Sequence, residues 1–398
     1  MKSLVILGST GSIGENALRV AQALPGALRV VGLSTRTKVR RVLEQARRFG
    51  VRMVAVEDRA AAREADALAR ADGIRVLAGP EGLAELASLP EADTVVCALV
   101  GLSGLSPVLA AMDAGHDIAL ATKEVLVSAG ELVMRRRAET GVRILPIDSE
   151  HSALFQCVQS PVSVAACVRG AGDAASLRAE DRIARLVLTA SGGPFAQRPD
   201  ADFERVTPQE ALAHPRWSMG PKVTIDSATM MNKGLEILEA HWLFDVSADK
   251  IGVVVHPESI VHSLVTFVDG TSMAQLSVPD MRFAIQYALT WPDRVAAEMP
   301  ALDLARLGEL TFLPPDEGRF PCLGLIREAA ACGGTMPTVV NAADEVAVEA
   351  FLDARIPFAG IWRLIERVMA AHTVVPCERF ETVFEADAWA REFASKAL

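Results

Sequence analysis

A glycine-rich turn near the N-terminus constrains the fold more than any other feature of the sequence. The turn Gly8-Ser9-Thr10-Gly11-Ser12-Ile13-Gly14 follows an apolar run at residues 4–7 and precedes a helical pattern over residues 12–24. Glycines allow a tight turn and the close approach of a ligand to the backbone, and the helix N-terminus offers free N–H groups to a phosphate. A glycine turn without a ligand is the alternative, but the strand-to-helix context favours a dinucleotide site.

Short apolar runs alternate with amphipathic stretches over the first 148 residues. The runs lie at residues 4–7, 30–33, 53–56, 94–99, 118–121 and 142–147. Strands separated by helical patterns of roughly 10 to 15 residues are typical of βαβ units in a parallel sheet. We therefore predict an α/β protein whose residues 1–148 form a doubly wound, Rossmann-like domain.

The pattern changes after residue 148, and we predict three further parts. They are a central α+β catalytic domain at 149–290, a linker at 291–315 and a C-terminal helical domain at 316–398. Within the central domain we expect a polar excursion at 169–185, a helix at 227–244, and a mixed or antiparallel sheet from apolar runs near residues 253, 264 and 274. The long Pro- and Arg-containing segment between residues 195 and 225 carries Trp217, which suggests a lid over the substrate.

Composition excludes several classes of protein. The net charge of −10 argues against a general nucleic-acid binder, and the chain has no apolar run long enough to span a membrane. The six cysteines form no C-x-x-C pair, which argues against a zinc site or a disulfide framework. This pattern, with no signal peptide in the sequence, predicts a cytoplasmic location.

The residues after the second predicted strand indicate which dinucleotide binds. An NAD-binding domain normally has Asp or Glu there, which hydrogen-bonds the ribose 2′-hydroxyl. This chain instead has hydroxyl and cationic side chains, Ser34-Thr35-Arg36-Thr37-Lys38. Guanidinium and ammonium groups suit a 2′-phosphate, so we predict NADPH, bound there by Arg36, Thr37 and Lys38.

An acidic motif, Asp148-Ser149-Glu150-His151, closes the predicted N-terminal domain. On a strand, Asp148 and Glu150 would turn both carboxylates to the same side, at the strand end where open α/β sheets bind ligands. Adjacent carboxylates repel unless a cation relieves them, and Mg²⁺ or Mn²⁺ would do so. A helix-capping carboxylate with a solvated neighbour is the alternative.

Two further segments carry polar groups that suit a phosphorylated substrate. In residues 226–236, Asn232, Lys233 and Glu236 share one face of a mostly apolar helix, so they face a cleft or are buried at a cost. Asn and Lys suit a phosphate, and Glu236 offers another oxygen to a metal. Lys123 follows a predicted strand and would polarise a carbonyl or hydroxyl beside the nicotinamide, unless it forms an ordinary Lys–Glu pair with Glu124.

Taken together, these segments resemble the 1-deoxy-D-xylulose 5-phosphate reductoisomerase family. The matching motifs run in order across nearly the whole chain. They are GSTGSIG at 8–14, LPIDSEHSALFQ at 145–156, SGGPF at 191–195, HPRWSMGPK at 214–222, DSATMMNKGLE at 226–236, HPESIVHS at 256–263, PDMR at 279–282 and NAADE at 341–345.

The resemblance implies a role for each matching residue. The implied metal ligands are Asp148, Glu150 and Glu236, and the implied catalytic set is Lys123, Ser149, Glu150 and His214. The implied substrate contacts are Ser149, Ser191, His214, Trp217, Ser227, Asn232, Lys233 and Glu236. The implied cofactor contacts are Thr10, Gly11, Ser12, Ile13, Glu124 and Gly220, together with Thr122, which stands where the family often has Asn.

The implied activity is conversion of 1-deoxy-D-xylulose 5-phosphate to 2-C-methyl-D-erythritol 4-phosphate, in the non-mevalonate route to isoprenoids. It needs NADPH and a divalent ion (Mg²⁺, Mn²⁺ or Co²⁺), and the family implies a homodimer. One alternative is another NADP-dependent reductase of phosphorylated sugars or semialdehydes, which would need no metal. The other is a non-catalytic NADP-sensing protein, which would not need carboxylates, a lysine and a lid around the cofactor site.

Overall fold

The computed structural model describes residues 1–167, 182–217 and 219–398. The described chain divides into two compact units. Unit 1 comprises Met1–Val125, Val133–Ser152 and Asp280–Pro300, and unit 2 comprises Leu126–Leu132, Ala153–Pro279 and Ala301–Leu398. Most of the polar excursion predicted at 169–185 lies outside the described residues. Among the helices that are described, none is both long and apolar enough to cross a membrane.

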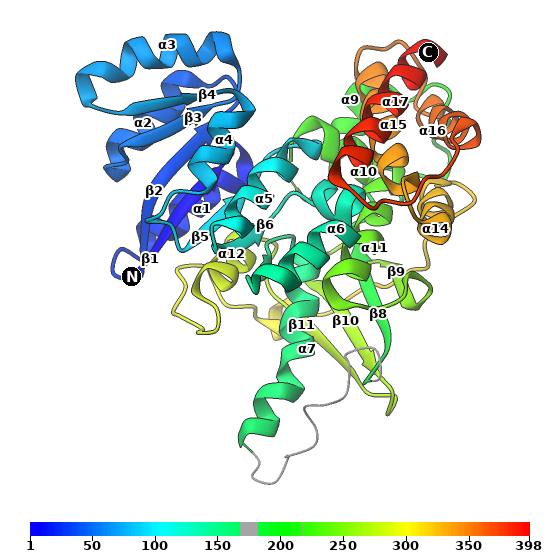
Figure 1. Cartoon of the computed structure of the whole chain (residues 1–398). Helices are drawn as coiled ribbons and strands as arrows, with labels where there is room; N and C mark the ends of the chain where they lie inside the picture. Colours follow the sequence, from blue (N-terminus) through cyan, green and yellow to red (C-terminus); the bar gives the residue numbers. More distant parts are fainter. Residues whose placement is uncertain (168–181, 218) are drawn as a thin grey trace. The chain divides into compact units, whose positions relative to one another are not determined.

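Unit 1 contains a parallel sheet with the strand order β4-β3-β2-β1-β5-β6-β7 in the described residues (Figure 1). Its strands are β1 Lys2–Leu7, β2 Leu28–Thr35, β3 Met53–Val56, β4 Arg75–Ala78, β5 Thr94–Cys97, β6 Asp117–Leu120 and β7 Ile144–Pro146. The order reverses at β1, between β2 and β5, which creates the crevice that doubly wound folds use for ligands. The predicted fold class is confirmed.

Helices cover the parallel sheet because each strand returns to the next through one. They are α1 Ser12–Ala23, α2 Val39–Phe49, α3 Arg59–Ala69, α4 Gly79–Ala87, α5 Leu105–Asp113 and α6 Glu124–Thr140. A later helix, α12 Met281–Thr290, packs against α1, and the Lys2 ammonium donates to the Leu289 carbonyl over 2.9 Å. Residues 280–300 therefore pack with the N-terminal residues, although the sequence analysis places them at the end of the catalytic domain and in the linker.

Unit 2 contains a mixed sheet with the order β11-β10-β8-β9 in the part described. Its strands are β8 Ile183–Ala190, β9 Ile251–Val255, β10 Val261–Phe267 and β11 Ser272–Leu276. The β8 and β9 strands are parallel, whereas β10 is antiparallel to both β8 and β11. The three apolar runs predicted near residues 253, 264 and 274 are therefore strands, and the expected mixed sheet is confirmed.

The helices of unit 2 enclose a continuous apolar core. They are the body of α7 Ser149–Cys167, then α9 Pro208–Leu212, α10 Pro221–Thr229, α11 Met231–Phe244, α13 Leu304–Leu307, α14 Cys322–Cys332, α15 Met336–Leu352, α16 Gly360–Ala371 and α17 Phe380–Ala397. Figure 1 shows α14 to α17, in orange and red, packed together as one group of helices. The short α9 begins with a capping box in which Thr207 and Glu210 bond each other's backbone N–H groups.

One helix prediction is wrong. The single helix expected over residues 227–244 is two helices, α10 and α11, which meet at Met230. Met230 has a φ of 64°, in the left-handed region that non-glycine residues seldom adopt. Its side chain is buried in the core, so packing compensates for the strain and the break redirects the chain between Ser227 and Asn232.

Candidate active site

The glycine turn joins β1 to α1 as the sequence predicts, and two of its glycines are required by geometry. Gly8 has a φ of 80°, and a Cβ atom there would lie 2.3 Å from the Ala98 carbonyl oxygen. A Cβ atom on Gly14 would lie 2.4 Å from the Gly8 oxygen. The backbone therefore folds tightly under the first turn of α1, which leaves the N–H groups at the helix start directed to a ligand.

The end of β2 is tied to this turn by hydroxyl groups. The Thr10 and Thr35 hydroxyls lie 2.7 Å apart, and the Ser34 hydroxyl accepts a hydrogen bond from Gly8 N over 2.9 Å. Lys38 extends back to donate to the Thr10 carbonyl over 3.3 Å. These contacts hold the end of β2 beside the phosphate-binding turn.

Arg36, Thr37 and Lys38 are exposed just beyond this anchor. In the described part of the chain, the Arg36 guanidinium forms no ion pair, whereas Arg41 and Arg47 on the following helix pair with Glu15 and Asp72. A cation without a protein counter-ion at the end of β2 is what recognition of a 2′-phosphate needs.

The segment after β6 places Thr122, Lys123 and Glu124 at the carboxyl end of the parallel sheet. The Thr122 hydroxyl donates to the Leu99 carbonyl over 2.8 Å, so its hydrogen is used within the protein. Its contact with the cofactor stays a prediction. The Lys123 ammonium forms an ion pair with the Asp148 carboxylate, and the two side chains are only 10% and 15% exposed. Lys123 is therefore a mostly buried side chain with Asp148 as a partner.

The acidic motif brings its carboxylates together at the start of a helix, the alternative placement that the sequence left open. The strand β7 ends at Pro146, and Ser149 already begins α7, so Asp148 and Glu150 lie at a helix start and not on a strand. A carboxylate oxygen of Asp148 and one of Glu150 still lie within 4.8 Å of each other. The Ser149 hydroxyl donates to Glu150 Oε2 over 2.5 Å. The pair is a reasonable set of hard oxygen ligands for Mg²⁺ or Mn²⁺.

His151 belongs to this group, although the sequence gives it no role. Its side chain is fully buried, and Nδ1 lies 4.0 Å from Asp148 Oδ2. The i, i+3 spacing at a helix start is the signal that could have found it.

In unit 2, the first turns of α11 hold three of the predicted substrate residues. Lys233 Nζ lies 2.6 Å from Glu236 Oε2, and the Asn232 amide donates to Glu236 Oε1 over 2.6 Å. The side chains of Lys233 and Glu236 are 4% and 1% exposed. Glu236 is therefore an oriented, buried carboxylate and not part of a solvated helix face.

The loop after β8 brings Ser191 towards Ser227. Gly193 has a φ of 66°, and a Cβ atom there would lie 2.6 Å from the Ser227 carbonyl oxygen. Only glycine permits this approach of the loop to α10. The Ser191 hydroxyl oxygen accepts from Gly193 N over 3.3 Å and lies 2.9 Å from His214 Nε2.

His214 links that serine to the segment that carries Trp217. Its Nδ1 accepts backbone N–H groups of Trp217 over 2.8 Å and of Arg216 over 3.2 Å. An accepting Nδ1 carries no hydrogen, so Nε2–H donates to Ser191. Burial lowers the pKa of His214 from its ordinary value of 6.5, which favours this neutral form. With two donors already directed at its oxygen, the Ser191 hydroxyl hydrogen is available to a phosphate.

The His256 ring bonds backbone groups and so has a structural role. Its Nε2 accepts from the backbone N–H groups of Ile260 and Val261, each over 3.1 Å, and its Nδ1 donates to the Thr311 carbonyl over 2.8 Å. Both ring nitrogens are thus occupied by the loop between β9 and β10 and by residue 311.

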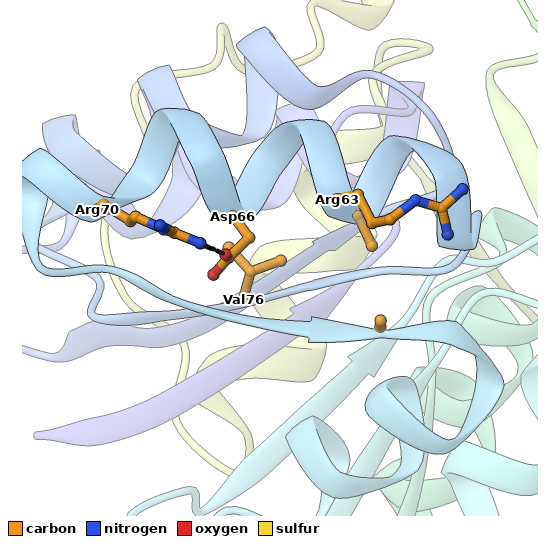
Figure 2. Close-up of a pocket in the computed structure, with 6 residues that line it drawn as sticks. Arg63, Asp66, Arg70 and Val76 are labelled. Carbon is orange, nitrogen blue, oxygen red and sulfur yellow. Dashed lines mark hydrogen bonds and ion pairs between the residues drawn. The ribbon is translucent and has the colours of Figure 1, made fainter.

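A separate cavity of about 380 Å³ lies between α3 and β4. Figure 2 shows Arg63, Asp66 and Arg70 on the helix above Val76, with Arg70 directed at Asp66. Because β4 is the outer strand and β1 is three positions away, this cavity is distinct from the glycine turn.

Family models match along almost the whole chain. A 1-deoxy-D-xylulose 5-phosphate reductoisomerase model matches residues 4–130, a model of that enzyme's C-terminal domain matches 144–244, and a DXP reductoisomerase C-terminal domain model matches 276–393. Curated reductoisomerases from Thermodesulfovibrio yellowstonii and Methylococcus capsulatus are 46% and 49% identical, over 100% of this chain and 100% and 99% of theirs. The chain belongs to the 1-deoxy-D-xylulose 5-phosphate reductoisomerase family.

Solved structures of this family agree with the fold. A reductoisomerase in complex with NADPH, fosmidomycin and magnesium matches with a TM-score of 0.93 at 39% identity, over 100% of this chain and 98% of the other. The Zymomonas mobilis reductoisomerase in complex with NADPH matches with a TM-score of 0.88 at 36% identity, with the same coverage. The family predicted from the motifs is confirmed.

Replacing Arg36 tests the 2′-phosphate assignment. We expect Arg36→Ala to raise the KM for NADPH about tenfold, because a charge-assisted hydrogen bond contributes roughly 1.5 kcal/mol. The KM for NADH should be unchanged. Steady-state kinetics with both cofactors measures this, and Arg47→Ala, which removes a paired arginine from the following helix α2, is the matched control. An equal loss for both cofactors would contradict the assignment.

The His214 tautomer predicts a pH dependence. Because burial lowers the pKa of His214, the neutral ring and its hydrogen bonds from Arg216 and Trp217 are complete above about pH 6.5 and are lost as the pH falls towards the lowered pKa. We expect kcat/KM for the substrate to fall on the acid side in the wild type, and His214→Gln to lower it at pH 8 and to flatten this acid limb.

His372→Gln is the control for this pH profile. Burial also lowers the pKa of His372, but this residue bonds Thr335 in the C-terminal helices. Its variant should keep the wild-type profile. An unchanged acid limb in His214→Gln would show that another group controls it.

Proposed function

We infer that the residues described above divide between them the reaction of this family. The chain catalyses the NADPH- and divalent-metal-dependent conversion of 1-deoxy-D-xylulose 5-phosphate to 2-C-methyl-D-erythritol 4-phosphate. One observation carries the assignment of residues. The Lys123–Asp148 pair adjoins Glu150 at the carboxyl end of the same parallel sheet that holds the glycine turn.

The cofactor is proposed to bind along the crevice at β1. The N–H groups at the start of α1 receive the pyrophosphate, with contacts from Thr10, Gly11, Ser12 and Ile13. Arg36, Thr37 and Lys38 hold the 2′-phosphate. Thr122, Glu124 and Gly220 complete the cofactor contacts in this proposal. NADPH supplies the hydride that reduces the rearranged aldehyde.

The divalent ion is proposed to bind the carboxylates of Asp148, Glu150 and Glu236. All three offer hard oxygen ligands. A bound cation would also offset the repulsion between the neighbouring carboxylates of Asp148 and Glu150. When bound, the ion supplies a Lewis acid that polarises the substrate ketone and stabilises negative charge on its oxygen. Lys123, which already contacts Asp148, donates a hydrogen bond to the reacting carbonyl. Ser149 directs its hydroxyl hydrogen at Glu150, and its oxygen accepts a hydrogen bond from a substrate hydroxyl.

The substrate phosphate is proposed to bind Ser191, Ser227, Asn232 and Lys233. Ser191 donates its hydroxyl hydrogen, which His214 and Gly193 leave available. Lys233 neutralises the phosphate while it orients Glu236, so one ammonium couples phosphate binding to a metal ligand. Trp217, attached to His214 through its backbone, closes over the substrate, and the binding energy of the phosphate drives that closure.

Metal-dependent oxidation of NADPH tests this function. We expect absorbance loss at the NADPH band when the protein is given 1-deoxy-D-xylulose 5-phosphate and Mn²⁺, and none with a chelator. Loss without metal would favour the alternative reductase, and NADPH binding without turnover would favour a sensing protein.

The variant Glu236→Gln sharpens this experiment. We expect kcat to fall beyond about 100-fold, the upper range for residues that only support metal ligands. NADPH affinity, measured by fluorescence, should be unchanged. Wild-type turnover and metal dependence in this variant would mean that Glu236 is not a ligand.

A homodimer and a cytoplasmic location complete the proposal. Among the described strands, β11 is at the edge of its sheet, where backbone groups can pair with another chain, and Met273 is 37% exposed there. The described cysteines are free thiols, which suits a reducing compartment. Light scattering should give twice the 42.4 kDa of one chain, and a mass of one chain would contradict the dimer.

A further inference from the structure

A buried charged cluster lies where the lid segment enters α10, and the function proposed above leaves it without a role. Lys222 lies in the first turn of α10. Its Nζ is 2.5 Å from Oδ2 of Asp226, one turn further along the same helix. It is also 3.0 Å from Oδ2 of Asp344, which belongs to α15. The Asp226 and Asp344 side chains are 2% and 0% exposed.

Asp344 depends on this contact. In the described part of the chain, neither of its carboxylate oxygens accepts a hydrogen bond, so the ion pair with Lys222 is what compensates its burial. Cys322 lies nearby and supplies no charge, because burial and the negative charge of Asp344 raise the pKa of its thiol well above the ordinary value. Two buried carboxylates therefore share the Lys222 ammonium.

Such a cluster is a poor way to stabilise a core. Taking each charge out of water costs several kcal/mol, and well-packed apolar residues of similar volume are often as stable or more so. A buried ion pair does fix the position of the two segments that carry it, because the charged atoms must stay in contact. The cluster is thus better explained by the position that it imposes on α10 than by stability.

We propose that Asp344 and Lys222 are positioning residues through which the C-terminal helices hold the start of α10. This helix has nine residues, begins directly after Gly220 and ends at the strained Met230. A helix so short has little stability of its own and depends on tertiary contacts. The clamp thereby fixes Ser227, further along α10, and the end of the lid that carries Trp217.

The inference rests on the proposed phosphate and lid roles of Ser227 and Trp217. It gives the C-terminal helices a task beyond packing. Binding of the remote phosphate can drive lid closure only if the segment that joins them is rigid, because a flexible joint would absorb the binding energy.

The clamp is tested with Asp344→Asn and Lys222→Met, singly and together. We expect each to lower kcat/KM for 1-deoxy-D-xylulose 5-phosphate by about 10- to 100-fold, as small misplacements of a binding group do. The KM for NADPH should change less than twofold or so, since unit 1 supplies its main contacts. The double variant should be no worse than the more impaired single variant, because the two residues act as one unit.

Glu345→Gln is the matched control. Glu345 is the next residue on α15 and pairs with Arg391 on α17 over 2.6 Å, so its loss disturbs the same helix without touching α10. We expect a lower Tm at most, with unchanged kcat/KM. Equal losses in Glu345→Gln and Asp344→Asn would overturn the clamp, because they would reflect general destabilisation of α15.

Hydrogen exchange provides a readout that needs no turnover. Amides at 224–229 should exchange faster in Asp344→Asn and Lys222→Met than in the wild type or Glu345→Gln. Unchanged exchange in both clamp variants would refute the proposal. If the wild type oxidised no NADPH, the proposed function would fail, while the exchange result would still decide whether Asp344 holds α10.

Discussion

Lysine–carboxylate pairs with little exposure to water are the interaction on which the functional groups of both units depend. Lys123 pairs with Asp148 in unit 1, and Lys233 pairs with Glu236 in unit 2. A buried carboxylate without a counter-ion would bind a proton, and a protonated acid is a poor metal ligand. The lysine ammonium groups offset the cost of burying these carboxylates and orient them for the cation that we propose they bind.

Backbone geometry is the second constraint, and it acts at a few strained positions. The left-handed φ of Met230 costs about 1–3 kcal/mol, which core packing must offset. The break separates Ser227, near the end of α10, from Asn232, near the start of α11. A helix N-terminus carries partial positive charge, so the start of α11 suits the phosphate that we assign to it.

Much of the fold and several features of the candidate site could be predicted from short segments of the sequence. The glycine turn, the alternation of strands and helices, and the cations at Arg36 and Lys38 are properties of short segments, and the structure bears out the fold they imply. The sequence decides less where the same short pattern is compatible with two kinds of secondary structure. For Asp148 and Glu150 the sequence leaves two placements open, the end of a strand or the start of a helix; β7 ends at Pro146, and the pair lies at the start of α7. The sequence analysis does not predict the strand β4, because its apolar run, Val76-Leu77-Ala78, is short and follows the exposed Arg75.

The sequence by itself determined the chemical groups, the order of the elements and the family, because residue type and periodicity act over short distances along the chain. Tertiary structure alone decided which groups are partners. The pairing of Lys123 with Asp148, of Ser191 with His214 and of Lys222 with Asp344 each joins residues from different segments of the chain. Such partners are selected by packing and by the cost of burying charge, and neither is visible until the elements have been assembled.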